Sequence, residues 1–163
     1  MGVTLRTATG RDRPAVLAFH RALYLEHRAS VMPPGREILY AYRRFEDVLR
    51  EDVDAMLKGR SHVLLAVRDG EPVGYVTGFV EHDPRRVLSR RGIIGDWYVV
   101  PEARGEGIGR QLCDALVARF EAEGCAVLEM ATWPFNAKTR RAIEALGFDE
   151  IQITYRRALG DDL

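Results

Sequence analysis

The sequence predicts a mixed α/β fold in which helices cover the faces of one central sheet. Residues 93–100 form a nearly continuous apolar strand, as in strands covered on both faces, and Pro101 ends it. A glycine-rich turn and a helix with an apolar face follow at 105–120. The pair Asp69-Gly70 separates two apolar runs and indicates a hairpin, so part of the sheet is expected to be antiparallel.

The first half of the chain predicts three strands and two helices. They are a strand from 3 to about 8, helices at 14–28 and 38–58, and hairpin strands at 63–67 and 73–80. Thr9 and Asp12 form a capping arrangement for the first helix, and Gly59 is placed to end the second. Gly74 and Gly78 indicate a bulge or a close approach of the backbone within the second hairpin strand.

The second half predicts a further βαβαβ order. Its elements are strands at 93–100, 126–131 and 151–155 and helices at 108–120 and 136–146, with Gly124 and Gly147 ending the helices. The last strand is predicted from the alternation of Ile151, Ile153 and Tyr155 with polar residues. The arginine-rich connection at 85–91 is expected to be a solvated loop, with a patch for an acidic substrate as the alternative.

Composition favours a globular protein and excludes two classes of partner. Of 163 residues, 47% are hydrophobic and 29% charged, and 24 basic side chains balance 24 acidic ones. The length predicts one domain over 1–163. We expect no nucleic-acid partner, because the chain carries no net positive charge that would attract phosphates. No apolar run approaches the roughly 18 residues of a membrane span, so we expect no membrane partner and a cytoplasmic protein. Cys113 and Cys125 lack metal-ligand spacing, and no metal is expected.

The turn after the central strand has the composition of a phosphate-binding loop. Its three glycines, at 105, 107 and 109, let the backbone approach a ligand, and the following helix presents its positive end. A Walker A loop needs Lys after its last glycine, where Arg110 stands. A dinucleotide fingerprint needs a glycine at that same position. The pattern that remains is Arg104-x-x-Gly107-x-Gly109.

This pattern resembles the acetyl-CoA motif of the GNAT superfamily of N-acyltransferases, which has Arg or Gln, then x-x-Gly-x-Gly or Ala, between a strand and a helix. A second family motif resembles the stretch from Asn136 to Gly147-Phe148. The resemblance extends over nearly the whole chain. It implies an α/β fold of the α+β type, with a mixed, mostly antiparallel central sheet and helices on both faces.

The resemblance also implies which residues bind acetyl-CoA as the co-substrate. Strand residues hold the thioester and pantetheine arm, and turn residues hold the pyrophosphate. They are Trp97, Tyr98 and Val99 on the strand, and Arg104, Gly105, Glu106, Gly107, Ile108, Gly109 and Arg110 in the turn. Asn136 is implied to contact the same arm.

The implied reaction is direct attack of an amine on the thioester, which needs no nucleophilic side chain. An alkylamine with a pKa near 10.4 is only about one part in 2,500 neutral at pH 7, a cost of roughly 4.6 kcal/mol, so a proton acceptor matters. Ribosomal-protein acetyltransferases of the superfamily carry a Glu on the strand that 126–131 resembles, which makes Glu129 the candidate. Asp96 and the strand-end pair Glu81-His82 are alternatives. Strand parity turns Asp96 to the opposite face unless a bulge intervenes.

The second motif departs from the family pattern at two positions. Ile143 stands where the family has the tyrosine that protonates the leaving thiolate, and Thr139 replaces the usual alanine. A thiol with a pKa near 8.5 leaves readily as an anion, so transfer does not require that acid. The sequence therefore favours an N-acetyltransferase, with a non-catalytic acyl-CoA sensor as the alternative.

The sequence says least about the acceptor substrate. The loop at 29–42 and the connection at 85–91, which should line its site, carry no motif. We expect a primary amine on a small molecule or a peptide. The runs Trp97–Val99 and Glu144–Phe148 also resemble aminoglycoside acetyltransferases, a weaker alternative because the acidic residues that bind polycationic drugs are not in place. A homodimer is left open.

Overall fold

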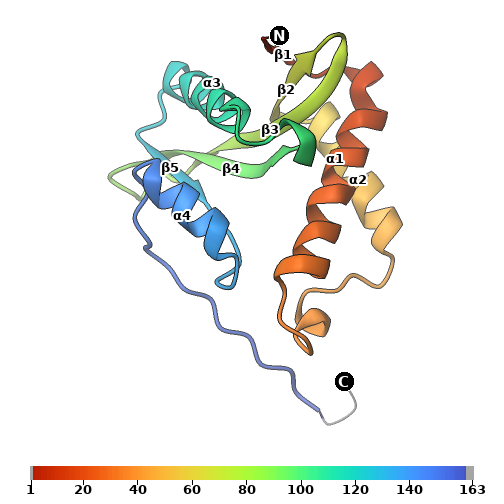
Figure 1. Ribbon diagram of the computed structural model, residues 1–163. Helices are drawn as coiled ribbons and strands as arrows, with labels where there is room; N and C mark the ends of the chain where they lie inside the picture. The colour runs from red at the N-terminus through yellow and green to blue at the C-terminus, as the bar shows by residue number, and fades with distance from the viewer. Residues whose placement is uncertain (1, 161–163) are drawn as a thin grey trace.

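One five-stranded sheet organises the chain in the computed structural model, which describes residues 2–160 (Figure 1). The strands are β1 (Thr4–Thr7), β2 (His62–Arg68), β3 (Glu71–His82), β4 (Arg90–Val99) and β5 (Val127–Met130), and they lie across the sheet in chain order. The pairs from β1 to β4 are antiparallel, and β5 joins β4 in parallel. The predicted mixed, mostly antiparallel sheet is confirmed.

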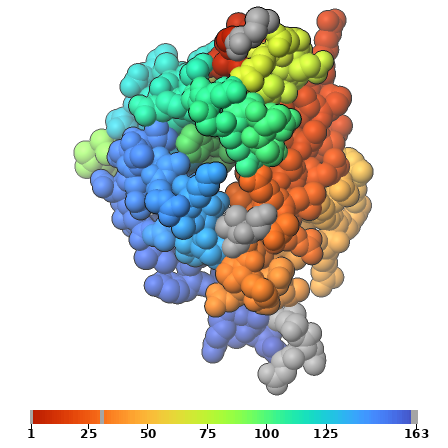
Figure 2. Space-filling model, in the orientation of Figure 1, coloured from red at the N-terminus to blue at the C-terminus, as the bar shows by residue number. Residues whose placement is uncertain are grey.

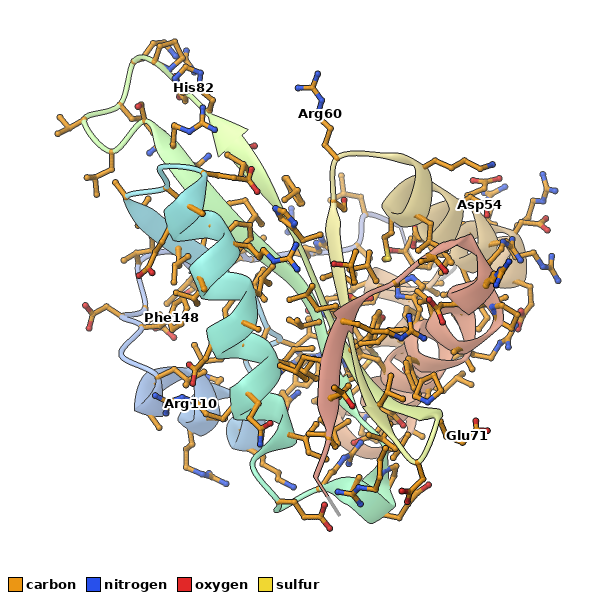
Figure 3. The ribbon with its side chains drawn as sticks, turned by 90° about the horizontal axis from the view of Figure 1, so that it is seen from above. Asp54, Arg60, Glu71, His82, Arg110 and Phe148 are labelled. Atoms are coloured by element: carbon orange, nitrogen blue, oxygen red, sulfur yellow. The ribbon has the colours of Figure 1, made fainter. Side chains whose placement is uncertain are left out.

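Helices cover both faces of this sheet. They are α1 (Arg13–Glu26), α2 (Phe45–Lys58), α3 (Ile108–Ala122) and α4 (Ala137–Ala145). Seen from above in Figure 3, α3 with Arg110 lies on one side of the sheet, and α2 with Asp54 lies on the other. Leu112 and Phe120 of α3 belong to one buried core, and Val16 of α1 belongs to another core on the opposite face. Among residues 2–160, no helix combines the length and hydropathy that crossing a bilayer requires.

The glycine and hairpin predictions are confirmed where they concern β2 and β3. Asp69 and Gly70 both have a positive φ, 51° and 81°, as a two-residue hairpin turn of this kind requires. A Cβ on Gly74 would lie 2.8 Å from the carbonyl oxygen of Tyr98, and one on Gly78 would lie 2.6 Å from the ring of Phe120. The two strand glycines therefore permit close contact with β4 and with α3.

A bulge in β4 changes which way its side chains point. Val76 pairs with Trp97 and Gly78 with Ile94, so the single residue Thr77 lies opposite both Gly95 and Asp96. The amide of Asp96 donates to the hydroxyl of Thr77 at 2.9 Å. Two residues opposite one reverse the side-chain alternation. Asp96 therefore points to the α1 and α2 face, although Ile94 packs in the α3 core.

Two predicted elements are wrong in extent or existence. The helix expected from residue 38 begins at Phe45, because an aromatic group holds the preceding loop: the Tyr24 hydroxyl donates to the Tyr40 carbonyl at 3.1 Å, and the rings of Tyr24 and Phe45 are 4.7 Å apart. The strand expected at 151–155 is absent. Residues 149–160 are exposed and form no helix or strand, because no strand within the described part of the chain pairs with them.

Candidate active site

The turn before α3 presents backbone N–H groups at a helix end. Gly105 and Gly107 both have φ of 81°, a left-handed conformation that side chains with a Cβ adopt with strain. Gly107 caps α3, and the first helical hydrogen bond runs from the amide of Gln111 to its carbonyl at 3.0 Å. The amides of the first helical turn have no intrahelical acceptor, so they are available to an anion, which the helix dipole also favours.

A gap in the sheet leads to this turn. β4 and β5 pair only as far as Ile94 and Met130, whereas β4 continues to Val99. The edge of β4 from residue 95 to 99 that faces away from β3 therefore has no strand partner among residues 2–160. The indole N–H of Trp97 donates to the carbonyl of Gly109 at 2.8 Å, which fixes the strand against the turn. Trp97 and Val99 turn their backbone groups to this edge, where the Val99 carbonyl accepts from Arg104, whereas the backbone of Tyr98 pairs with Tyr75 of β3.

The charged residues of the turn are paired within the chain. Arg104 donates to Glu26 at 2.7 and 2.9 Å and to the Val99 carbonyl at 2.8 Å. The hydrogen bonds to Glu26 raise the pKa of Arg104 and lower that of the carboxyl. Arg110 contacts Asp114 at 3.1 Å, and Glu106 pairs with Arg68. A bound pyrophosphate would compete with these carboxylates for the two turn arginines.

Asn136 is buried at the start of α4, and its side chain makes hydrogen bonds within the protein. Its side-chain oxygen accepts from the amide of Thr139 at 3.3 Å and so caps the helix. Its side-chain nitrogen lies 3.2 Å from Nε2 of His27, which can accept because burial lowers the pKa of His27 and favours the neutral ring. Asn136 therefore joins α4 to the end of α1, across the gap between β4 and β5.

On the other face of the sheet, four polar side chains from different elements converge. Nδ1 of His20 lies 2.6 Å from Asp96, and Nε2 of the same ring lies 3.0 Å from Asp52. The hydroxyl of Tyr75 donates to Asp96. We call His20, Asp52, Tyr75 and Asp96 the His20 cluster. It draws one residue from each of α1, α2, β3 and β4.

The two carboxylates determine the protonation of the His20 cluster. Burial disfavours the charged imidazole, but Asp96 and Asp52 outweigh burial and raise the pKa of His20. A protonated ring donates to both carboxylates at once. Burial, followed by the negative charge of Asp96, raises the pKa of Tyr75 far above its ordinary value, so its hydroxyl stays protonated and continues to donate.

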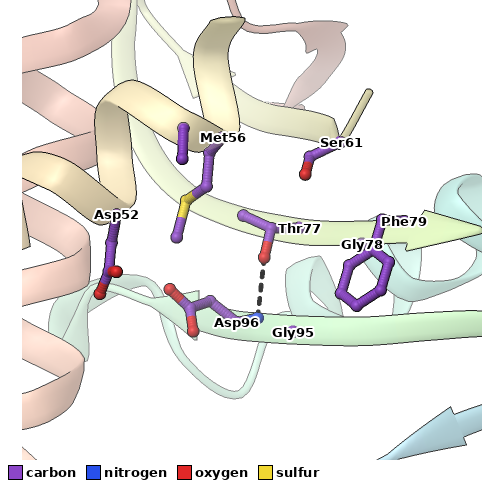
Figure 4. A pocket seen from close by; sticks show the side chains of 9 residues that line it. Asp52, Met56, Ser61, Thr77, Gly78, Phe79, Gly95 and Asp96 are labelled. Carbon is purple, nitrogen blue, oxygen red and sulfur yellow. Dashed lines mark hydrogen bonds between the residues drawn. The ribbon is translucent and has the colours of Figure 1, made fainter. Parts of the chain in front are cut away.

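A cavity of about 240 Å³ opens beside this cluster (Figure 4). It is lined by Asp52, Ala55, Met56, Ser61, Thr77, Gly78, Phe79, Gly95 and Asp96. Asp52 enters from α2 and Asp96 from β4, with Met56 above Thr77 and the ring of Phe79 toward the other end (Figure 4). The cavity combines two carboxylates with apolar surface, which suits a cation that carries a hydrocarbon part.

The other candidate proton acceptors lie apart from this cavity lining. Glu129 is on β5 opposite Ile93, and its carboxylate pairs with Arg91, whose pKa it raises. Arg91 also pairs with Glu81 at the end of β3. His82 follows there and is exposed. Glu129 is therefore held in an ion pair outside the cavity lining.

Three members of the His20 cluster were not singled out as site residues from sequence. His20 directly follows the core residue Phe19, Asp52 directly precedes the core residue Val53, and Tyr75 is fully buried. The available signal was a polar residue flanking the apolar face of each helix. That signal is common on amphipathic helices, and it does not identify partners that are 32 and 76 positions apart.

Comparison with known families identifies the chain. Residues 21–148 match the model of the Acetyltransferase (GNAT) family. The chain belongs to the GNAT family. It is accordingly an acyltransferase, and the recognition made from the Arg104-x-x-Gly107-x-Gly109 turn is confirmed.

Curated GNAT relatives are similar over most of the chain. An aminoglycoside N(6')-acetyltransferase type 1 of Stenotrophomonas maltophilia is 31% identical over 110 residues, which cover 66% of this chain and 72% of the relative. A mycothiol acetyltransferase of Thermobispora bispora is 31% identical over 162 residues, or 96% of this chain and 50% of that protein. The relatives thus act, by their names, on different acceptors.

Two solved structures share the fold. The BH1408 protein of Bacillus halodurans, as a tetramutant, superposes with a TM-score of 0.79 at 22% identity, covering 96% of this chain and 99% of that one. The aminoglycoside acetyltransferase AAC(6')-Iy, in complex with a bisubstrate analogue of CoA, superposes with a TM-score of 0.74 at 21% identity, covering 98% and 100%. At these identities the likeness establishes the α/β architecture.

Proposed function

We propose that this GNAT protein transfers the acetyl group of acetyl-CoA to a primary amine of a small molecule or a peptide, by direct attack within a ternary complex. One observation carries the proposal. Asp96 belongs to the His20 cluster and lines the cavity, and the next residue, Trp97, lies on the unpaired edge of β4. An acceptor in the cavity and a thioester along that edge would therefore meet at one bulge of one strand.

The residues present fit acetyl-CoA. An added Cβ at Gly109 would lie 3.3 Å from the indole nitrogen of Trp97, and Gly105 and Gly107 have open space at their Cβ positions. In the stretch 97–99 the outward-facing backbone groups of Trp97 and Val99 would hold the pantetheine arm, and the amides from Gly105 to Arg110 would hold the pyrophosphate. Bound acetyl-CoA would supply the activated acyl group with a thiolate as the leaving group.

We assign the role of proton acceptor to Asp96 with His20. An ammonium group must lose a proton before it attacks, and Asp96 offers a carboxylate at the cavity wall. His20 and Tyr75 donate to that carboxylate and hold it in place. Glu129 remains the rival assignment, with its carboxylate engaged by Arg91.

The His20 cluster also provides a route for the proton to leave. The side chains of Asp96 and His20 are 20% and 14% exposed, whereas that of Asp52 is 44% exposed. The ring of His20 lies between the two carboxylates, within hydrogen-bond distance of both. When the ring is neutral and carries its proton on Nε2, Nδ1 can take up a proton from Asp96 while the Nε2 proton passes to Asp52 and then to water.

The lining of the cavity favours a cationic acceptor with some hydrocarbon surface. Asp52 and Asp96 supply negative charge, while Met56 and Phe79 supply apolar contact. The sequence did not reveal that these two carboxylates face one cavity. Their arrangement suits a polyamine or an amino sugar as the acceptor. The aminoglycoside acetyltransferases among the relatives make the second of these a reasonable acceptor to include.

The proposal is tested by thiol release from acetyl-CoA with a panel of alkylamines, amino acids, peptides, polyamines and amino sugars. We expect release with at least one cationic amine and none with an alcohol of the same shape. Acetyl-CoA binding without release for any acceptor would favour the sensor instead. Ile143 is the observation that keeps this second candidate, because α4 carries no tyrosine at the position of the family acid.

A further inference from the structure

Two neighbouring residues at the end of α1 reach the two elements that would hold acetyl-CoA. Glu26 pairs with Arg104 of the turn before α3 at 2.7 Å. Nε2 of the half-buried His27 lies 3.2 Å from the side-chain nitrogen of Asn136, at the start of α4. Figure 2 shows this turn (green), α4 (blue) and α1 (orange to red) next to one another on one face of the molecule. A ligand that runs from the turn along the unpaired edge of β4 would therefore pass the ring of His27.

The hydrogen bonds of Asn136 determine where His27 carries its proton. The side-chain oxygen of Asn136 accepts from the amide of Thr139 at 3.3 Å, so its side-chain nitrogen is the atom that faces His27. That nitrogen can only donate, so Nε2 of the imidazole accepts and we assign the ring proton to Nδ1. Within the described part of the chain this N–H has no hydrogen-bond acceptor, so it is available to a ligand.

The surroundings keep the ring of His27 neutral. Burial lowers its pKa below the ordinary value, and this effect outweighs the negative charges of Glu26 and Asp96, which act in the opposite direction. The indole of Trp133 packs beside the imidazole, with the ring centres 5.2 Å apart. A neutral imidazole held in this way can donate a hydrogen bond to a developing negative charge without first being protonated.

Acetyl transfer to an amine produces such a negative charge on sulfur. The amine nitrogen forms a bond to the acyl carbon, the carbon–sulfur bond breaks, and its electron pair stays on the sulfur. The proton of the amine goes to Asp96 in the proposed function. Ile143 occupies the position of the family tyrosine, so α4 offers no hydroxyl to the sulfur from that position.

We propose that His27 is a further catalytic residue, whose Nδ1–H donates a hydrogen bond to the sulfur of acetyl-CoA as the thiolate leaves. The inference rests on the proposed function, because it concerns the same transfer. His27 keeps its proton, since giving it up would leave a negatively charged ring. The sulfur therefore leaves as a thiolate, stabilised by a hydrogen bond to an ionised acceptor, and later takes a proton from water.

The thiol of bound CoA tests this contact without any turnover. A hydrogen bond to the thiolate should raise the acid dissociation constant of the bound thiol about 10- to 100-fold over that of free CoA. The ultraviolet absorbance of the thiolate follows the titration, and desulfo-CoA provides the blank. The ring of His27 does not titrate in this alkaline range, because its pKa is lowered. A bound thiol with the pKa of free CoA in the unmodified protein would overturn the proposal.

Two substitutions separate the donor from the bridge to Asn136. The amide nitrogen of His27→Asn is attached to the γ carbon, as Nδ1 is, whereas that of His27→Gln lies one bond further out, as Nε2 does. We expect His27→Asn to keep the acidified thiol and most of kcat. His27→Gln should lose both, with kcat for the amine reduced about 10- to 100-fold.

The matched control is His62→Gln, the same substitution at another half-buried histidine. His62 pairs with Glu123 and lies outside the lining of the cavity, so this variant should leave the thiol pKa and kcat unchanged. A circular dichroism melt checks that each variant is folded.

The thiol pKa and turnover distinguish this inference from the proposed function. If no amine released thiol while the bound thiol stayed acidified in His27→Asn and not in His27→Gln, the proposed transfer would fail but the hydrogen bond from His27 to the sulfur would stand. Equal thiol pKa values in the two variants would overturn the inference. A higher KM with unchanged kcat in His27→Gln would also overturn it, because His27 would then only hold Asn136 in place.

Discussion

The turn at 104–110 before α3, which we call the cradle, consists of backbone groups, whereas the His20 cluster consists of side chains. The cradle uses backbone groups of consecutive residues, and the two arginines beside it are already paired with Glu26 and Asp114. The cluster uses four side chains from four elements, up to 76 positions apart. Under the proposed function, binding at the cradle depends on backbone conformation, whereas the action of the cluster depends on protonation. A glycine substitution should impair the first, and an isosteric change of charge should impair the second.

The largest effect is expected from Asp96→Asn. It removes the proton-accepting carboxylate but keeps the shape of the side chain, so kcat/KM for the amine should fall about 10²–10⁴-fold. The dissociation constant of acetyl-CoA, measured by calorimetry, should stay nearly unchanged, because the cradle lies on the other side of β4.

Glu129→Gln is the matched control for this change. It also replaces a carboxylate by its amide, at a side chain that already pairs with Arg91. We expect turnover close to that of the unmodified protein. Loss of turnover in Glu129→Gln together with normal turnover in Asp96→Asn would transfer the role of proton acceptor to β5.

The second effect concerns the cradle alone. Acetyl-CoA at 100 times its Kd should stabilise the native protein by about 2.7 kcal/mol, which raises Tm by several degrees. Gly107→Val should abolish this rise. Gly70→Val is the control, because Gly70 has the same φ of 81° and the same open space but lies in the β2–β3 hairpin. Both variants should lose similar basal stability. A ligand-induced rise that persists in Gly107→Val would exclude the cradle as the binding site.

The turn before α3 could be predicted from the sequence, whereas the His20 cluster could not. The conformation of the turn could be predicted because Gly105, Gly107 and Gly109 are close together in the chain and directly precede the helix. The hairpin at Asp69-Gly70 was predicted for the same reason. The cluster was not, because the contact of His20 with Asp96 depends on a bulge in β4, and periodicity carries no information about where an extra residue enters a strand.

The two incorrect elements have non-local causes as well. The start of α2 is shifted to Phe45, whose ring contacts that of Tyr24 in a different helix at a tilt of 41°. The last strand was predicted from the alternation of Ile151, Ile153 and Tyr155, and that pattern is present in the sequence. A strand also needs a neighbour, and the sequence of one chain does not specify which edge, or which copy, supplies it.

A smaller effect is expected from pH. The pKa of His20 is raised above its usual value near 6.5, so its contribution to stability is fully present below that pH and is lost as the pH rises through the raised value. Turnover should change in the opposite direction, up to about tenfold per pH unit, because a neutral ring is needed to take the proton from Asp96.

The substitution His20→Gln should flatten both profiles. His82→Gln is the control, because His82 is an exposed histidine at the end of β3. Chemical denaturation at several pH values measures the free energy of unfolding, and thiol release measures turnover. Turnover and stability that rise together across this range would contradict the proton route through His20.

The smallest effect tests whether the two sides of β4 are independent. Glu26→Gln should weaken the hold on Arg104 and leave its guanidinium free for the pyrophosphate. The pair is partly exposed, at 38% and 33%, and such pairs contribute about 0–1 kcal/mol, so the affinity for acetyl-CoA should rise at most about fivefold. Glu46→Gln breaks the pair with Arg21 instead and changes the net charge equally, so it should leave the affinity unchanged.

The gain in affinity for acetyl-CoA in Glu26→Gln should diminish with added salt, because it comes from an exposed charge. Weaker binding in Glu26→Gln would show instead that Glu26 positions Arg104 for the ligand, and then a side chain of α1 would contribute to both the cradle and the acceptor face.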